Sequence, residues 1–172
     1  MAANSSSIAV LSEIPEIAGS ARLADVGRGS GAVLTGVLAA NPVSAAEVRE
    51  RCDIVPGYFF ESVPGGCDAY LLKHVVHNWS DDAAVTILRH CRESMPPDAV
   101  LYLVETVVPD DPTEFDAVTM IRDLNMLVLL TGKERTRTDF EQLLAAAGLE
   151  LAGVSPLARP AHRFCLISAS MA

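Results

Sequence analysis

Apolar and polar positions follow one another along the chain in blocks typical of strands alternating with helices. Four short, almost wholly apolar runs cover residues 22–26, 52–55, 69–75 and 100–104. Strands that are apolar on both faces are typical of a parallel sheet whose two faces are covered. Two further runs, residues 149–154 and 163–168, are close enough in sequence to form an antiparallel hairpin at the sheet edge.

The segments between these runs carry apolar residues every three or four positions, as on one face of an amphipathic helix. In residues 81–95, for example, Ala84, Leu88 and Cys91 share one face. Further helices are predicted over residues 32–40, 44–51, 115–130 and 138–147. The alternation predicts an α/β fold with a Rossmann-like sheet and helices on both faces.

Composition narrows the picture mainly by exclusion. The 172 residues are 50% hydrophobic and 20% charged, which favours a folded core. A net charge of −9 without a dense basic stripe argues against nucleic acid as a partner. Charged residues interrupt the longest apolar stretch, and the N-terminus lacks the basic start of a signal peptide. We therefore expect a cytoplasmic protein that binds no membrane, with residues 1–20 as a weakly ordered lead-in and residues 21–172 as one domain.

The cysteines offer neither a metal site nor a disulfide framework. They stand at positions 52, 67, 91 and 165, without a CxxC pair and without a nearby group of histidines. Zinc sites and disulfide-rich domains both depend on closer and more regular spacing. We expect reduced thiols, mostly buried, and no bound metal.

A glycine-rich turn, residues 25–31, leaves the first predicted strand and opens a helix. Glycine lets the backbone bend sharply and approach a ligand, while the amides of the helix start point at it. Asp25, Gly27 and Gly29 are therefore candidate binding residues, although a glycine turn in any α/β domain explains the pattern equally well. Arg28, in the middle of the turn, would suit an anion better than a positively charged ligand.

His77 is the first candidate for acid–base chemistry, because it follows a predicted strand at the edge where open α/β sheets bind ligands. A histidine there can take a proton from a hydroxyl near neutral pH, or it can simply cap the next helix. Glu105 ends the strand 100–104, and Glu134 lies in the turn 132–136. Either carboxylate could orient the imidazole, and either could equally be an ordinary surface or cap residue.

Several motifs in order carry a family resemblance. They are Lys73 with His77-Asn78-Trp79, Leu103-Val104-Glu105, Asp123-Leu124-Asn125-Met126-Leu127 and Gly132-Lys133-Glu134-Arg135-Thr136. Together they resemble the plant-type and polyketide-tailoring O-methyltransferases, which use S-adenosylmethionine. The glycine turn and residues 57–64 resemble further motifs of that family, so the resemblance runs from about residue 22 to the C-terminus.

The resemblance implies a class I methyltransferase sheet and a role for each matching residue. His77 would be the general base that removes a proton from a phenol or another hydroxyl of a small molecule. Glu105 and Glu134 match the two acids that flank this histidine. The residues that match the S-adenosylmethionine site are Asp25, Gly27, Gly29, Phe59 and Lys73, and those that match the acceptor pocket are Asn125 and Met126.

The chain also departs from the family pattern. Arg28 replaces the middle glycine of the turn, and Tyr58 stands where the family usually has an aspartate for the adenine amino group. Only ten residues separate Asn41 from Cys52, too few for the second strand–helix unit and its ribose-binding acid. The helical N-terminal domain, through which the family dimerises, has no counterpart. These departures predict an abridged sheet and an impaired donor site beside an intact base.

Three hypotheses follow from this contrast. The chain is an O-methyltransferase acting on an aromatic or polyketide-like hydroxyl with a weakened donor site. Alternatively, it is an enzyme of the same fold that performs a cyclisation, elimination or rearrangement steered by His77. As a third reading, it is a non-catalytic remnant that binds a partner. The exposed sheet edge left by a missing strand would favour a homodimer or an association with a related full-length protein.

Overall fold

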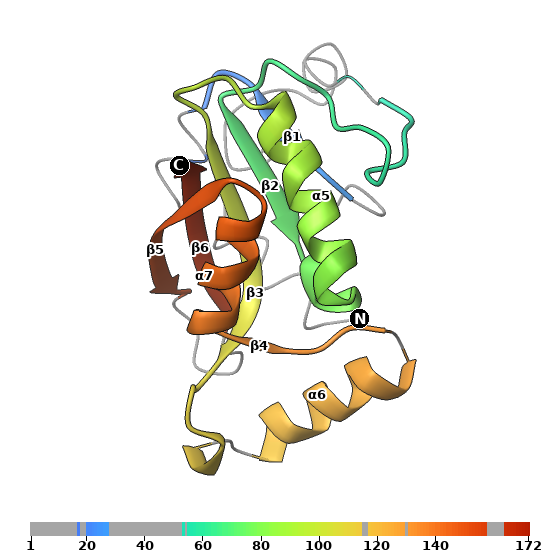
Figure 1. The fold of residues 1–172 in the computed structure, drawn as a ribbon, viewed down its shortest axis with the longest axis vertical. Coiled ribbons are helices and arrows are strands. Elements are labelled where there is room, and N and C mark those ends of the chain that lie inside the picture. The colour runs from blue at the N-terminus through green and yellow to red at the C-terminus, as the bar shows by residue number, and fades with distance from the viewer. Residues whose placement is uncertain are drawn as a thin grey trace, which may run out of the picture.

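The computed structural model describes residues 17, 20–27, 53, 55–114, 117–129, 131–157 and 164–172. These residues form a six-stranded mixed sheet, with two helices packed against it and a third beyond one end (Figure 1). In chain order the elements are β1 (Leu23–Asp25), β2 (Ala69–Lys73), η1 (Val76–Asn78), α5 (Asp81–Ser94), β3 (Val100–Val108), η2 (Pro112–Glu114), α6 (Ala117–Leu129), β4 (Arg135–Thr136), α7 (Arg137–Ala146), β5 (Leu149–Pro156) and β6 (Phe164–Met171).

The strands are arranged in the order β1-β2-β3-β6-β5, and the short β4 pairs with β3. Strands β1, β2 and β3 are parallel, whereas β6 is antiparallel to both β3 and β5. This confirms the predicted C-terminal hairpin at the sheet edge. In the register of the parallel strands, Asp25 lies opposite Leu71, and Lys73 lies opposite Val104. The carboxyl ends of β1 and β2 therefore meet along one edge, and β3 continues beyond them.

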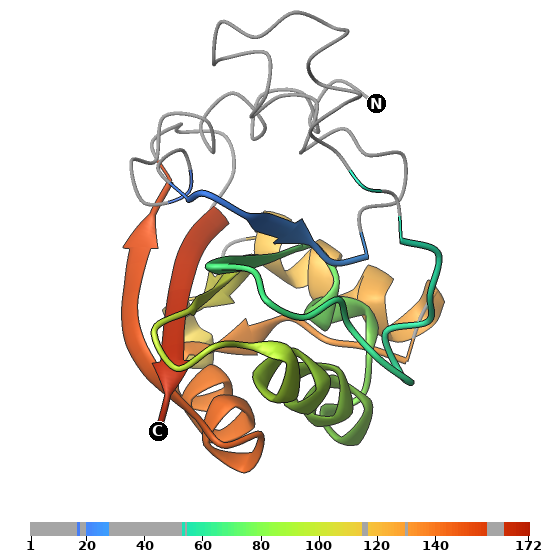
Figure 2. The same cartoon turned by 90° about the horizontal axis from the view of Figure 1, so that it is seen from above.

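Strands β2 and β3 are buried on both faces of the sheet, which explains why these two strands are continuous apolar runs. On one face, Tyr70, Leu72 and Leu103 pack with the apolar sides of α5 and α7. Figure 2 shows these two helices on the same side of the sheet. On the opposite face, Leu71 and the neighbouring strand residues pack against Ile17, which is 2% exposed.

Two strand boundaries differ from the prediction. Strand β2 ends at Lys73 rather than at residue 75, because His74 adopts a φ of 55° and turns the chain into η1. Strand β3 extends to Val108 because β6 and β4 pair with it beyond the end of β2, so Glu105 lies within a strand and not at its end. The prediction of a strand over residues 52–55 is wrong for the two residues described there, Asp53 and Val55, which lie outside any strand.

The predicted helices over 81–95, 115–130 and 138–147 are confirmed, with small shifts, as α5, α6 and α7. Two caps explain where α5 and α7 begin. Ser80 accepts the Ala83 N–H at the start of α5, and Thr136 and Asp139 form a reciprocal capping box at the start of α7. Each cap depends only on residues three apart in the sequence, so these helix starts are local properties.

The predicted helices over 32–40 and 44–51, Arg28, Gly29 and the expected missing strand–helix unit lie outside the described residues. The division into a lead-in and one domain stays a prediction. Among the helices of the described ranges, none combines the length and the apolar character that crossing a membrane requires.

Candidate functional site

The site begins at a sharp turn at the carboxyl end of β2. Among the described residues, His74 is the one non-glycine residue with a positive φ, a conformation that costs free energy and is held here by its neighbours. Its N–H donates to Val104 O at 3.1 Å, and Asn78 Nδ2 donates to His74 O at 3.0 Å. Val75, which follows, is in the right-handed helical region. Successive residues of opposite hand point their N–H groups into one concavity, which suits an anion.

The carboxylate of Glu105 fills this concavity. Its Oε1 accepts the backbone N–H groups of Val75, Val76 and His77 at 3.1, 2.9 and 3.4 Å. The residue is 0% exposed. Burial raises the pKa of Glu105 to about 7, and the nearby imidazole and amide groups oppose the shift. Glu105 thus ties the backbone that carries His77 to the middle of the sheet.

The imidazole of His77 lies between two carboxylates. Its Nδ1 is 3.6 Å from Glu105 Oε2 and 3.8 Å from Glu134 Oε1, distances of ion pairs rather than hydrogen bonds. The three side chains are 14%, 0% and 4% exposed. Burial alone would lower the pKa of His77, but the carboxylates of Glu134 and Glu105 outweigh it and raise the pKa. The result is a partly buried histidine with strengthened basicity.

The predicted trio of His77, Glu105 and Glu134 is thus brought together, although the three residues come from η1, β3 and the turn before β4. The backbone of Glu134 is anchored to α6, because its N–H donates to Asp123 Oδ1 at 3.0 Å. The acid–base roles of the three side chains remain proposals, since geometry alone assigns no reaction.

The described part of the predicted donor site lies at the neighbouring strand ends. Gly27 follows β1 with a φ of 72°, and a Cβ there would meet Val75 Cγ2 at 3.0 Å and Phe59 Cε1 at 3.5 Å. The Phe59 ring and Val75 therefore occupy the space that a side chain at this position would need, and only glycine fits this backbone conformation without strain. The residues present fit a ligand that approaches the backbone at Gly27 and lies along an aromatic ring.

Lys73, at the end of β2, connects the two halves of the site. Its burial lowers the pKa of the ammonium group, and the carboxylates of Glu105 and Asp25 oppose that shift. Lys73 is therefore within electrostatic reach of both Glu105, beside His77, and Asp25, beside the glycine turn. Asp25, the last residue of β1, is the candidate donor residue.

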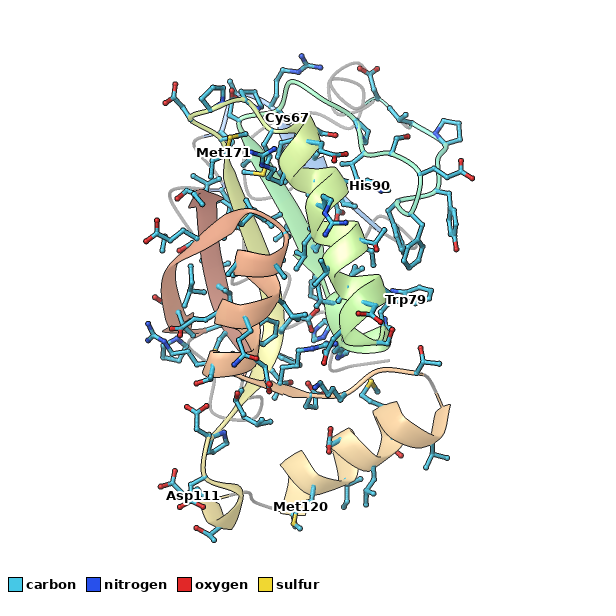
Figure 3. The ribbon with its side chains drawn as sticks, in the orientation of Figure 1. Cys67, Trp79, His90, Asp111, Met120 and Met171 are labelled. Carbon is cyan, nitrogen blue, oxygen red and sulfur yellow. The ribbon has the colours of Figure 1, made fainter. Side chains whose placement is uncertain are left out.

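Tyr58 gives the donor side an exposed aromatic surface where the family pattern expects a carboxylate. The residue is 54% exposed, and its ring is stacked on Phe59 with centroids 5.9 Å apart and planes at 24°. Behind them, Phe60 meets Trp79 edge-on at 4.7 Å, and Figure 3 shows Trp79 beside the start of α5. The aromatic cluster therefore leads from the glycine turn to the segment that carries His77.

The predicted acceptor residues lie on α6, beyond the carboxyl ends of the parallel strands (Figure 1). Asn125 is exposed and Met126 is half-buried. Met120 is 53% exposed and points away from the sheet in Figure 3. The helix is joined to the trio of His77, Glu105 and Glu134 by the hydrogen bond from Glu134 N–H to Asp123. The assignment of Asn125 and Met126 to an acceptor pocket stays a prediction.

His74, His77 and Glu105 also offer ligand atoms that lie within 4.8 Å of one another. Two imidazoles and a carboxylate can bind transition metals in other proteins. Here Glu105 commits Oε1 to three backbone amides, and His77 Nδ1 already faces two carboxylates. Acid–base pairing accounts for the cluster, and the expected absence of a metal remains a prediction.

Sequence reasoning missed Gly132, Arg135 and Asp123 as parts of the site. A Cβ on Gly132 would overlap the His77 carbonyl oxygen. The Arg135 guanidinium donates hydrogen bonds to the backbone carbonyls of Val76 and Trp79, on either side of His77. The available signal was the charged run Lys133-Glu134-Arg135 directly after a glycine. That pattern is ordinarily a solvated turn, so burial of the arginine could not be inferred from it.

Comparisons with known proteins show relatives of this chain in sequence and in fold. The sequence profile of the O-methyltransferase domain matches residues 35–150. The chain is 37% identical over 155 residues to the mitomycin biosynthesis 6-O-methyltransferase of Streptomyces lavendulae, covering 79% of this chain and 44% of that protein. The solved structure of a mitomycin 7-O-methyltransferase superimposes with a TM-score of 0.86 at 32% identity, over 99% of this chain and 54% of that one.

A third similar protein was solved with ligands. It is an O-methyltransferase from neocarzinostatin biosynthesis, in complex with S-adenosyl-L-homocysteine and 1,4-dihydroxy-2-naphthoic acid, with a TM-score of 0.75 and 28% identity over 98% of this chain and 58% of that one. The chain spans about half the length of the relatives that it matches, 44% of the mitomycin enzyme. With the profile covering most of its length and a shared class I methyltransferase fold, this chain belongs to the O-methyltransferase domain family.

Proposed function

We propose that this chain is the catalytic part of an S-adenosylmethionine-dependent O-methyltransferase that acts on a hydroxyl of an aromatic or polyketide-like small molecule. One observation carries the proposal: His77 Nδ1 is held 3.6 Å from Glu105 and 3.8 Å from Glu134, at the strand ends that also carry Gly27 and Lys73. A base of raised pKa beside a backbone-lined ligand turn is what hydroxyl methylation requires.

His77 is the general base of this proposal. Because Nδ1 faces the two carboxylates, Nε2 is the nitrogen left for the acceptor hydroxyl. His77 takes the hydroxyl proton, and Glu105 and Glu134 stabilise the imidazolium that forms. S-adenosylmethionine, when bound, supplies an electrophilic methyl group on a sulfonium centre. The methyl group would pass to the acceptor oxygen with S-adenosylhomocysteine as the leaving product, and His77 would keep the hydroxyl proton.

The donor would be held by the residues at the ends of β1 and β2. Gly27 lets the backbone approach it, Phe59 offers an aromatic face, and Asp25 and Lys73 supply the nearby charges. Tyr58 replaces the carboxylate that would hold the adenine amino group. We therefore propose a weakened donor site, with affinity lower by about one to three factors of ten than a site with that contact and a ribose acid.

A second function is acid–base chemistry without methyl transfer, such as an elimination, cyclisation or rearrangement. It is favoured by the contrast between His77, which is flanked by two buried carboxylates, and the aromatic, 54% exposed Tyr58 on the proposed donor side. The same histidine would then donate or accept a proton on a substrate that needs no donor. A homodimer or an association with a related full-length protein stays a prediction alongside either function.

Calorimetry with S-adenosylmethionine and S-adenosylhomocysteine is the first test. We expect saturable heat for both ligands; no heat at millimolar concentration contradicts the methyltransferase and leaves the second function. Transfer of labelled methyl is then measured with 1,4-dihydroxy-2-naphthoic acid, the compound bound by a similar enzyme. Glu134→Gln should slow the transfer, whereas Glu141→Gln, a change in an exposed ion pair on α7, should not.

A further inference from the structure

The guanidinium of Arg135 directs four of its hydrogen bonds to the segment around His77 and one to Lys133 in its own turn. The residue is 1% exposed, and a guanidinium has five N–H bonds. Nη1 donates to Val76 O at 3.0 Å and Lys133 O at 3.5 Å, and Nη2 donates to Trp79 O at 2.8 Å. Nε and Nη2 also donate to Asp81 Oδ1 at 3.1 and 2.9 Å. No N–H is therefore left over for a ligand.

Three of the residues that accept these hydrogen bonds lie on either side of His77 in the chain. Val76 precedes His77, and Trp79 and Asp81 follow it. A buried guanidinium is stable only where its charge and donors are satisfied, so the backbone of this turn must keep its place for Arg135 to be buried. Conversely, the planar, rigid fork sets the positions of the Val76 and Trp79 carbonyls relative to each other.

Gly132, three residues before Arg135, packs closely against the same turn. A Cβ at this position would overlap the His77 carbonyl oxygen and lie 2.6 Å from the Asn78 carbonyl carbon. Glycine is required here by close approach of two backbones. Between these two points, the Lys133 ammonium pairs with Asp81 Oδ2 at 3.0 Å, and Glu134 faces His77.

We propose that residues 132–135 form a clamp that sets the position of His77 relative to Glu134, with Arg135 as its main positioning residue. The catalytic consequence rests on the proposed function of His77, but the placement itself does not. Arg135 is joined directly to Glu134 in the chain and by hydrogen bonds to both sides of His77. It therefore holds the acid and the base in one frame without touching acceptor or donor.

The test uses the charge environment of His77. The charged and titratable groups that face its ring are Glu105 from β3, Glu134 and Arg135 from the clamp, and His74 from the end of β2. Burial and the positive charge of Arg135 lower the pKa of His77, while the two carboxylates raise it. Arg135→Lys keeps the charge and loses the fork, so it isolates geometry from charge.

The measurement is a pH titration of the four histidine side chains by NMR in the full chain, with His77 assigned through His77→Gln. We expect Arg135→Lys to lower the pKa of His77 by about 0.5 units or more, because Glu134 moves away from the ring. Arg137→Lys is the matched control, since Arg137 pairs with Glu141 on an exposed helix face. An unchanged His77 pKa in folded Arg135→Lys overturns the proposal.

A second variant keeps the test decisive if Arg135→Lys does not fold, as checked by circular dichroism. Gly132→Ala changes no charge and should lower the pKa of His77 in the same direction, because the added methyl displaces its backbone. Gly57→Ala is its control, as a Cβ there would meet nothing within 4 Å. A His77 pKa that is equal in both glycine variants contradicts the clamp. No substrate is needed, so absent methyl transfer would refute the proposed function without touching this result.

Discussion

The proposed catalytic side and the proposed donor side of this molecule are built in opposite ways. On the catalytic side, Glu105 and Glu134 are almost fully buried, and Oε1 of Glu105 receives three backbone amides. On the donor side, Tyr58 stacks on Phe59 and is more than half exposed. A proton-transfer site needs groups held in place, whereas a binding face can change side chains with little effect on the fold. The contrast predicts that a change on one side leaves the other side largely unaffected.

The largest expected effect comes from the base itself. His77→Ala should reduce kcat for methyl transfer by about 10²- to 10⁴-fold, since it removes the proton acceptor. Donor affinity, measured by calorimetry, should stay within about twofold, because each tenfold loss would need ~1.4 kcal/mol of lost contact. A donor affinity that falls together with kcat would break the separation of the two sides.

The next largest effect is expected at Glu105. Glu105→Gln removes the charge that faces the imidazole and leaves an amide in a buried site, so kcat should fall and the fold should lose about 1–3 kcal/mol. Chemical denaturation and single-turnover kinetics would measure the two losses. Asp82→Asn, an exposed change in the first turn of α5, serves as a control. Full stability in Glu105→Gln would show that the amide concavity does not depend on the carboxylate charge.

A smaller, directional effect is expected in the pH profile. His77 acts as a base only when neutral, and its pKa is raised by the neighbouring carboxylates, so the rate should rise with pH through a value above that of an ordinary histidine. Glu134→Gln removes one of the raising charges, and the rising limb should move to lower pH by about 0.5–1 unit. A limb that stays in place would mean that Glu134 does not act on His77.

The smallest effect is expected on the donor side. Tyr58→Asp should strengthen binding of S-adenosylhomocysteine by up to about tenfold, because it supplies an acceptor for the adenine amino group. The exposed position should leave the midpoint of unfolding unchanged. Tyr58→Asn, which offers an uncharged acceptor, should bind with intermediate affinity. Weaker binding in Tyr58→Asp would instead assign the stacked tyrosine to donor recognition.

The sequence correctly predicted those elements whose formation depends mainly on neighbouring residues. The helix predicted over 81–95 is observed at Asp81–Ser94 because its N-cap, Ser80, directly precedes the segment and its apolar spacing lies within it. The strand predicted over 52–55 was wrong at Asp53 and Val55, since a short apolar run forms a strand only with a partner ladder. Similarly, β3 is longer than predicted because β6 and β4, distant in sequence, pair with its second half.

In the candidate site, too, some features could be predicted from the sequence and others could not. Sequence motifs identified His77, Glu105 and Glu134 as candidates. Their side chains come close together because the chain turns at His74. This turn has a positive φ at a residue other than glycine, so nothing in the sequence signalled it. The burial of Arg135 could not be predicted, because a charged side chain is buried only when acceptors from elsewhere in the chain surround it.

By itself, the sequence determined the α/β class, the helices α5 to α7, the C-terminal hairpin and the family, since periodicity, caps and motifs are carried by neighbouring residues. Only the tertiary structure decided that three backbone amides meet the Glu105 carboxylate and that residues 132–135 close over His77. Those contacts join residues about 30 to 60 positions apart, and their geometry follows from how the strands and helices pack.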